Sequence, residues 1–199
     1  MNKIPGQSDL LACAVEAARA AGNHALTNIH RRNEIAQKFE HDVKLLLDLE
    51  CQKKAEEVIR HAYPEHLILG EEGGSFDEKA DKLWIIDPID GTVNFMHGLP
   101  LWCSSVAVRA GGDVVAGAVY LPTMKECYTA TLDGPALCNG EPIGVSKTDR
   151  LGDAIVLTGL SKNVVENLYT FDVLKAVSLK VQKARIMGAA AVDICYVAS

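Results

Sequence analysis

Apolar residues recur at helical spacing in two stretches near the start of the chain. The first stripe lies in residues 10–29 and predicts a helix. Ser8 and Asp9 come directly before it, and both residue types are typical helix N-caps. A second stripe, in residues 48–62, predicts another helix with Leu49 on its inward face. The N-terminal region is therefore expected to contribute a helix pair.

Shorter apolar runs predict strands in the middle of the chain and a mixed pattern after it. Two buried strands are expected at 67–69 and 83–86. An antiparallel meander is expected at 101–109, 114–121 and 126–131, with a glycine hairpin between its first two strands. Later strands at 154–158 and 184–187 alternate with helices at 164–176 and 189–198. This order predicts a mixed α/β protein built as a layered sandwich.

Acidic residues stand directly after the two buried strands. Glu71 and Glu72 follow the first strand on a glycine-rich segment, and Asp87 and Asp90 follow the second across Pro88. Carboxylates on rigid strand ends supply the oxygen ligands that Mg²⁺ prefers. The spacing therefore indicates a divalent-metal site.

A plain surface turn is the alternative interpretation of these acids, because Asp-Pro and Asp-Gly steps are common in turns. Pro88 favours a rigid turn that carries Asp87 and Asp90. Ile89 between them is apolar, which a solvated turn rarely needs. Gly91 allows close approach of a ligand, and backbone N–H groups at a following helix start favour phosphate. The combination predicts phosphoryl transfer or phosphate hydrolysis.

The segment from Trp84 to Phe95, which contains Asp-Pro-Ile-Asp-Gly-Thr, resembles the signature of the inositol monophosphatase family. The Gly70-Glu71-Glu72 step and the segments 117–122 and 188–198 are also similar to that family. The resemblance runs from about Leu10 to the last residue. It implies an αβαβα sandwich of the Mg²⁺-dependent, lithium-sensitive sugar phosphatases.

The resemblance also implies a set of metal ligands. Glu71, Asp87 and the Ile89 carbonyl would hold one Mg²⁺, and Asp87 would bridge to a second ion shared with Asp90.

Substrate contacts follow from the same resemblance. The phosphate would be held by the Gly91 and Thr92 amides, and Thr92, with Asp48 behind it, would orient the attacking water. Glu71, Ile89 and Asp90 would also border the substrate, as would Gly188, Ala189 and Ala190 in the last helix.

The chain departs from the family pattern in two places. In the segment from Lys38 to Asp48, Asp42 and Asp48 have the expected spacing, but Leu45 replaces the usual Thr. The family's later Trp-Asp-x-x-Ala-Gly segment, whose Asp binds the second metal, has no counterpart before Ser199. We therefore expect either a partial chain or a short homologue, with one well-held Mg²⁺ and a weak second site. The expected lobes are residues 1–145 and an incomplete α/β lobe, 146–199.

The composition of the chain argues against two kinds of partner, nucleic acid and a membrane. The net charge of −6, with no basic cluster, argues against nucleic acid. No apolar run is long enough for a membrane span. Six scattered cysteines favour free thiols in a reducing cytoplasm.

The predicted activity is Mg²⁺-dependent hydrolysis of a small phosphate ester, with myo-inositol monophosphate as the expected substrate. Fructose bisphosphate, histidinol phosphate and a 3′-phosphoadenylate are alternatives within this class. A catalytically silent fold that binds Mg²⁺ or a partner protein is the alternative from another class. A homodimer is compatible with an exposed sheet edge.

Overall fold

The computed structural model describes residues 6–38, 43–74, 80–159 and 169–199. The helices are α1 (Gln7–Thr27), α2 (Leu46–Ala62), α3 (Thr92–Met96), α4 (Tyr169–Ser178) and α5 (Ala190–Ala198). The strands are β1 (Ile35–Lys38), β2 (Val43–Leu45), β3 (Leu67–Gly70), β4 (Gly73–Gly74), β5 (Lys82–Asp90), β6 (Cys103–Ala110), β7 (Asp113–Leu121), β8 (Glu126–Thr131), β9 (Leu137–Cys138), β10 (Glu141–Pro142), β11 (Ile155–Leu157) and β12 (Lys183–Arg185). These elements confirm the predicted mixed α/β class.

A sheet of eight strands forms the centre of the molecule, in the order β10-β9-β8-β7-β6-β5-β3-β4. Strands β6 to β8 form the predicted antiparallel meander, in which β6 and β7 join through a turn with positive φ at Gly111 and Gly112, and β5 pairs antiparallel with β6. Strand β3 pairs with β5 in parallel. This parallel pairing brings the carboxyl ends of β3 and β5 to the same edge of the sheet, because parallel strands run in one direction.

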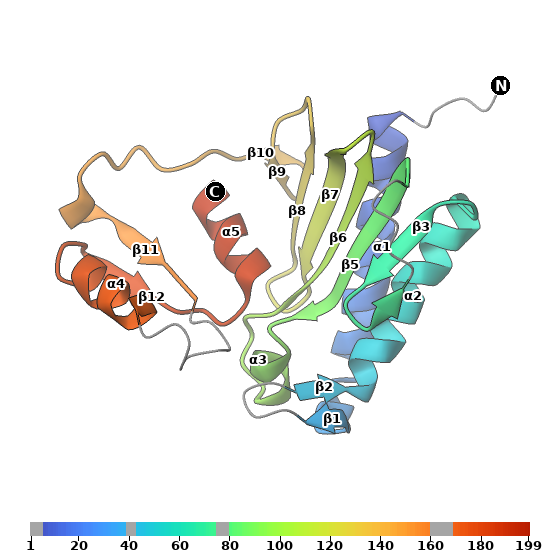
Figure 1. The fold of residues 1–199 in the computed structure, drawn as a ribbon, viewed down its shortest axis with the longest axis horizontal. Coiled ribbons are helices and arrows are strands. Elements are labelled where there is room, and N and C mark those ends of the chain that lie inside the picture. The colour runs from blue at the N-terminus through green and yellow to red at the C-terminus, as the bar shows by residue number, and fades with distance from the viewer. Residues whose placement is uncertain (1–5, 39–42, 75–79, 160–168) are drawn as a thin grey trace.

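Helices α1 and α2 cover one face of the sheet (Figure 1). The buried side of α1 is made of small residues, so its backbone can lie close to the strands; the fully buried ones are Ala14, Ala17, Ala18, Ala21 and Ala25. The predicted cap was wrong: the N-cap is Gly6, and Ser8 and Asp9 lie inside the first turn of α1. Leu49 was also assigned to the wrong face, since it is 37% exposed on α2.

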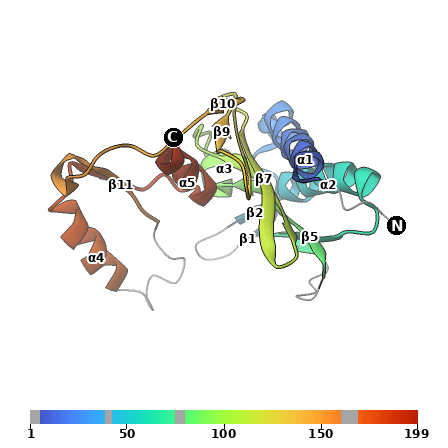
Figure 2. The same cartoon turned by 90° about the horizontal axis from the view of Figure 1, so that it is seen from above.

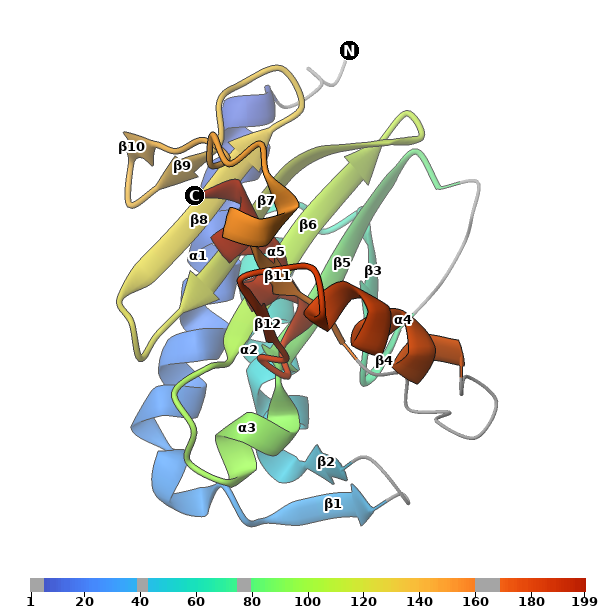
Figure 3. The same ribbon diagram turned by 90° about the vertical axis from the view of Figure 1, so that its left-hand side faces the viewer.

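The opposite face of the sheet carries α5, followed by the parallel pair β11 and β12 and then by α4 (Figure 2). Figure 3 shows these elements in front of the sheet. The layers therefore alternate as α, β, α, β, α, which confirms the predicted sandwich. The predicted helix 164–176 is described from Tyr169 onward, and residues 164–168 lie outside the described residues. The division into lobes at residue 145 stays a prediction.

The six cysteines all lie in the described residues, and the structure pairs none of them in a disulfide. Trp84 and Trp102 lie fully buried in the core that α1 and α2 form with the sheet. Among the described helices, none has the length and apolar character needed to cross a membrane.

Candidate active site at the ends of β3 and β5

The parallel pair β3–β5 positions the first two acidic side chains. Gly70 lies opposite Ile86, and the Glu71 N–H donates to the Ile86 carbonyl over 3.0 Å, which extends the ladder by one step. Glu71 and Asp87 therefore leave neighbouring strands at the same level. Their proximity follows from the parallel direction of β3 and β5. The apolar runs in the sequence predict the two strands but not this direction.

A β-bulge brings Asp90 to the same side as Asp87. Asp87 pairs with Ser105 and Asp90 pairs with Cys103, so two residues of β5 lie opposite Ser104 alone. In a regular strand, residues three apart point to opposite faces, and the extra residue reverses this. The predicted rigid turn at Asp87–Asp90 was wrong, because this segment remains in β5. The bulge, in place of the expected turn, brings Asp87 and Asp90 to the same side.

A pocket of about 190 Å³ lies at these strand ends. It contains all four residues that the sequence predicted as metal ligands and six of the eight predicted substrate contacts, three of which are also predicted metal ligands. Its lining residues are Val43, Lys44, Glu71, Glu72, Asp87, Ile89, Asp90, Gly91, Thr92, Val93 and Gly188. Asp48, Ala189 and Ala190 lie outside this lining.

Asp87 is the most strongly perturbed acid of the pocket. Burial, and after it the neighbouring charges of Glu71 and Asp90, raise the pKa of Asp87 to about 8. Its Oδ1 atom is buried and has no hydrogen-bond partner among the residues that the structure describes. A buried carboxylate with a free oxygen and acidic neighbours is costly without a cation. The surroundings of Asp87 therefore favour a positively charged ligand.

Asp48 is the second buried acid near this edge. Its Oδ2 atom accepts the Leu45 N–H over 2.7 Å at the start of α2, and its Oδ1 atom is buried with no partner in the described part of the chain. Burial raises the pKa of Asp48 to about 7, with smaller contributions from Glu72 and Glu71. Among the described residues Asp48 and Thr92 share no hydrogen bond, so their joint role stays a prediction. Asp42 lies outside the described residues.

Gly91 and Thr92 connect the bulge to α3. Gly91 has φ of +87°, and a Cβ atom there would lie 2.9 Å from the Cβ of Ala189 and 3.1 Å from the Leu101 carbonyl. Only glycine fits both the conformation and the space. The Thr92 hydroxyl donates to the Ile89 carbonyl over 2.9 Å. Thr92 thereby fixes the orientation of a carbonyl that was predicted to bind metal.

Asp90 joins the pocket to the last helix. Its two carboxylate oxygens accept the N–H groups of Ala190, at 3.1 Å, and Ala191, at 2.7 Å, in the first turn of α5. The Cys103 thiol donates to Oδ2 over 3.7 Å. An anion at a helix N-terminus is favourable, because the unpaired N–H groups point toward it. The structure thus brings residues 188–190 next to Asp90 and Gly91, from a hundred positions away in the chain.

Asn94 fastens the segment before α5. Its side-chain amide donates to the carbonyls of Leu101 and Met187, both over 2.7 Å. Gly188 has φ of +80°, and a Cβ atom there would lie 3.1 Å from the Asn94 amide. Sequence reasoning gave Asn94 no role, although its place in the Thr92–Phe95 segment was a usable signal.

Lys44 and Gln52 are two further residues that the sequence did not single out. Lys44 lines the pocket and forms an ion pair with Glu72, with 3.1 Å between Nζ and Oε2. Gln52 accepts the Glu72 N–H over 2.9 Å and donates to the Gly73 carbonyl over 3.0 Å. These contacts hold the turn after β3, and with it the backbone at Glu71.

The donor atoms suit a hard dication, because they are all oxygens. Across the described ranges, no three His, Cys, Asp or Glu side chains are gathered closely enough to form a ready metal cluster. The fit rests instead on a mixed set: the free buried oxygen of Asp87, the Glu71 carboxylate and the Ile89 carbonyl. Asp90 differs, because α5 already engages both its oxygens.

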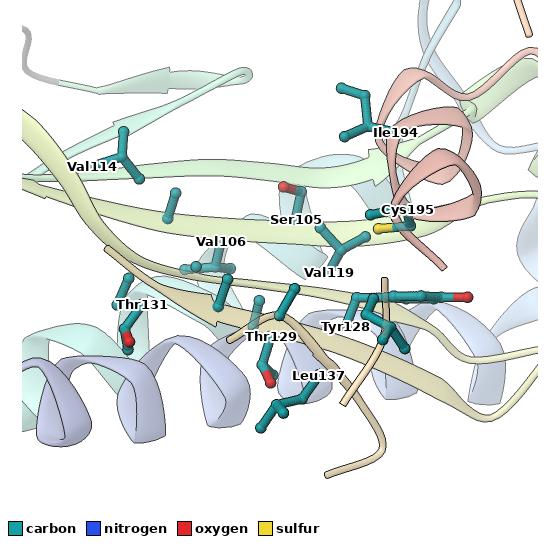
Figure 4. A pocket seen from close by; sticks show the side chains of 18 of the residues that line it. Ser105, Val106, Val114, Val119, Tyr128, Thr129, Thr131, Leu137, Ile194 and Cys195 are labelled. Carbon is teal, nitrogen blue, oxygen red and sulfur yellow. The ribbon is translucent and has the colours of Figure 1, made fainter. Parts of the chain in front are cut away.

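A second pocket of about 310 Å³ lies on the α5 side of the sheet, over β6, β7 and β8. Figure 4 shows Ser105, Val119, Tyr128 and Cys195 around it. Its lining contains no acidic side chain. It therefore lacks the donors for a cation, and the smaller acidic pocket is the candidate active site.

The fold and the acidic pocket together define a layered α/β protein with an all-oxygen donor site at a sheet edge. The chain belongs to the inositol monophosphatase family, whose model matches residues 6–199. This membership confirms the resemblance and makes the chain a phosphatase of a metal-dependent family.

Curated relatives cover nearly the whole chain. It is 32% identical to inositol monophosphatase of Mesembryanthemum crystallinum over 199 residues, with 96% of this chain and 73% of the relative covered. It is 37% identical to Nus factor SuhB of Haemophilus influenzae over 194 residues, with the same two shares.

Solved structures show the same fold. The extragenic suppressor protein SuhB from Bartonella henselae superposes with a TM-score of 0.88 at 30% identity, over 95% of this chain and 74% of that one. The Thermotoga maritima IMPase superposes with a TM-score of 0.84 at 33% identity, over 95% and 72%.

Proposed function

We propose that this chain hydrolyses a phosphate monoester with the help of Mg²⁺, and that the substrate is myo-inositol monophosphate. The observation that carries the proposal is the buried, unpartnered Oδ1 of Asp87, which lies in a pocket with Glu71, Asp90 and the Ile89 carbonyl. Family membership supports the reaction class, and the relatives named inositol monophosphatase support the substrate.

Mg²⁺ is the cation that we assign to the pocket, because the donors are carboxylate and carbonyl oxygens. Glu71, Asp87 and the Ile89 carbonyl would hold it. When bound, such an ion neutralises charge on the phosphate and on the leaving oxygen and lowers the pKa of water.

We infer that one ion is held well and a second weakly. Asp87 has an oxygen free for a first ion, whereas both oxygens of Asp90 accept N–H groups of α5. A carboxylate that already accepts two hydrogen bonds presents less free lone-pair density to a cation. The expected bridge between Asp87 and Asp90 is therefore the weaker part of the site.

The chain's own residues would then place the substrate. The backbone N–H groups of Gly91 and Thr92 adjoin the acidic cluster, so a phosphate held there lies beside the cation. Lys44 supplies a positive side chain on the same wall of the pocket. Thr92 would orient the attacking water through its hydroxyl, which now donates to the Ile89 carbonyl. We assign Asp48, behind Thr92, to the orientation of the same water.

Gly188, with Ala189 and Ala190 directly after it in the chain, would border the rest of the substrate. Gly188 lines the pocket, and the Ala190 N–H is tied to Asp90. The backbone there offers small, neutral contacts, which suit a polyol ring better than a second phosphate.

Small phosphate esters remain the partners that we propose. The words Nus factor belong to the names of several relatives. The net charge of −6 of this chain opposes binding of a polyanion, and we propose no nucleic-acid partner.

Phosphate release from a panel of esters tests the proposal. The panel contains myo-inositol monophosphate, fructose bisphosphate, histidinol phosphate and a 3′-phosphoadenylate, each with Mg²⁺ and with a chelator. We expect Mg²⁺-dependent release with the highest kcat/KM for inositol monophosphate. A higher value for another ester would keep the reaction and replace the substrate. No release from any ester would favour the catalytically silent, metal-binding alternative.

A further inference from the structure

Ser104 is a fully buried polar residue that lies opposite the bulge in β5. Between the pairs Asp87–Ser105 and Asp90–Cys103, it is the one residue of β6 that faces both Pro88 and Ile89. The bulge interrupts the ladder, so a backbone group in it needs another partner.

The Ser104 hydroxyl supplies that partner. It donates to the Pro88 carbonyl over 2.6 Å, in a fully buried position. Pro88 has no N–H and contributes no donor of its own. One side-chain bond therefore holds the carbonyl of the residue between Asp87 and Ile89.

The environment of Ser104 leaves this hydroxyl little freedom. Ser104 faces α1, and a Cβ atom added at Gly22 would lie 3.3 Å from its Oγ atom. Ser105, its neighbour in β6, lines the apolar pocket on the α5 side of the sheet. Ser104 thus acts on the bulge from the core side, whereas the acidic side chains lie on the other side.

The position of the bulge decides where two proposed ligand groups lie. The Pro88 peptide connects the Asp87 backbone to Ile89, whose carbonyl is fixed from its other side by Thr92. Rotation of the Pro88 peptide would turn the Ile89 carbonyl and shift Asp87 relative to Glu71. A displacement of about 1 Å is enough to weaken a metal site.

We propose that Ser104 is a positioning residue for the metal ligands: its hydroxyl fixes the bulge that aims Asp87 and the Ile89 carbonyl into the acidic pocket. This inference rests on the proposed Mg²⁺ site and adds to it a residue that touches neither cation nor substrate. Outer groups that orient ligands commonly change metal affinity by about 10-fold or more.

The test compares three variants of the full chain by calorimetric titration with Mg²⁺ and by thermal melting without metal. Ser104→Ala removes the donor, and Ser104→Cys keeps a weak S–H donor. Tyr120→Phe is the control, because it removes a hydroxyl that joins the same face of the sheet to Asn23 of α1 and does not touch the bulge. We expect Mg²⁺ affinity to fall about 10-fold in Ser104→Ala, less in Ser104→Cys, and to stay unchanged in Tyr120→Phe.

Three other outcomes would overturn the inference. Folded Ser104→Ala that melts at a lower temperature but binds Mg²⁺ as tightly as the wild type would show a purely structural role and overturn the inference. If Ser104→Ala does not fold, unchanged affinity in Ser104→Cys would overturn it equally. Wild-type chain that binds no Mg²⁺ would overturn the proposed function and this inference with it, whereas tight binding by both the wild type and Ser104→Ala would overturn this inference alone.

Discussion

Replacement of Asp87 by Asn should make the metal-free protein more stable at alkaline pH. The pKa of Asp87 is raised from 3.8 to about 8, first by burial and then by Glu71 and Asp90. A raised pKa means that the folded state retains the proton that the unfolded chain loses. The stability that the protonated Asp87 carboxyl contributes is therefore fully present below about pH 4 and is lost as the pH rises toward 8.

The size of this loss follows from the same two values. The interval between 3.8 and about 8 corresponds to roughly 6 kcal/mol, at about 1.4 kcal/mol for each pKa step. This is an upper bound, because the exposed Glu71 side chain can turn away from the ionised Asp87. We expect Asp87→Asn to recover about 1–3 kcal/mol at pH 8, or a rise in Tm of roughly 3–10 °C.

Thermal melting in chelator at pH 8 and pH 4 measures this effect. The variant and the wild type should melt at similar temperatures at pH 4, because the folded carboxyl is protonated there and the unfolded carboxyl, with its pKa of 3.8, is still about half protonated, which costs only about 0.6 kcal/mol. Mg²⁺ should raise the Tm of the wild type at pH 8 and leave the Tm of the variant unchanged. The variant should also lose Mg²⁺-dependent turnover. A lower Tm for Asp87→Asn at pH 8 would refute the argument, since it would mean that the ionised carboxylate is well accommodated without a cation.

Three further predictions concern α3 and its surroundings. Thr92→Ala should lower kcat more than it raises KM in initial-rate assays, because the hydroxyl acts mainly in the transition state; an unchanged kcat would make Thr92 a plain phosphate contact. Gly91→Ala should lose about 1–3 kcal/mol in urea unfolding, given φ of +87° and the contact with Ala189; unchanged stability would contradict that strain. Asn94→Ala should speed amide exchange at residues 187–191, because two hydrogen bonds disappear; unaltered exchange there would show that α5 alone holds this segment.

The sequence predicted the elements well where their signal is local. The two buried strands and the meander follow from apolar runs and a glycine hairpin, and the structure has both, whereas the parallel pairing of β3 with β5 was not predicted. The start of α1 was misplaced because Ser8 and Asp9 are good caps in isolation, yet the helix continues to Gly6. Leu49 was placed inward because an exposed leucine on α2 is not distinguished by periodicity alone.

The candidate site was predictable in composition but not in construction. The acids after β3 and β5 were visible as residues at strand ends, and four of them line one pocket. The bulge was not visible, because it exists only through the pairing of β5 with β6. The bonds from Asp90 to α5 and from Ser104 to Pro88 also join segments far apart in the chain. Such contacts are set by tertiary packing and leave no local pattern.

The central claim is that the acidic pocket at the ends of β3 and β5 holds a divalent cation. Its most direct test is a crystal structure of the 199-residue chain soaked with Mn²⁺ as a substitute for Mg²⁺, with the ion located by its anomalous scattering. We predict a strong peak bounded by the Asp87 carboxylate, the Glu71 carboxylate and the Ile89 carbonyl, and no such peak in Asp87→Asn. A peak elsewhere, or an empty pocket at Mn²⁺ concentrations that support phosphate release, would contradict the account.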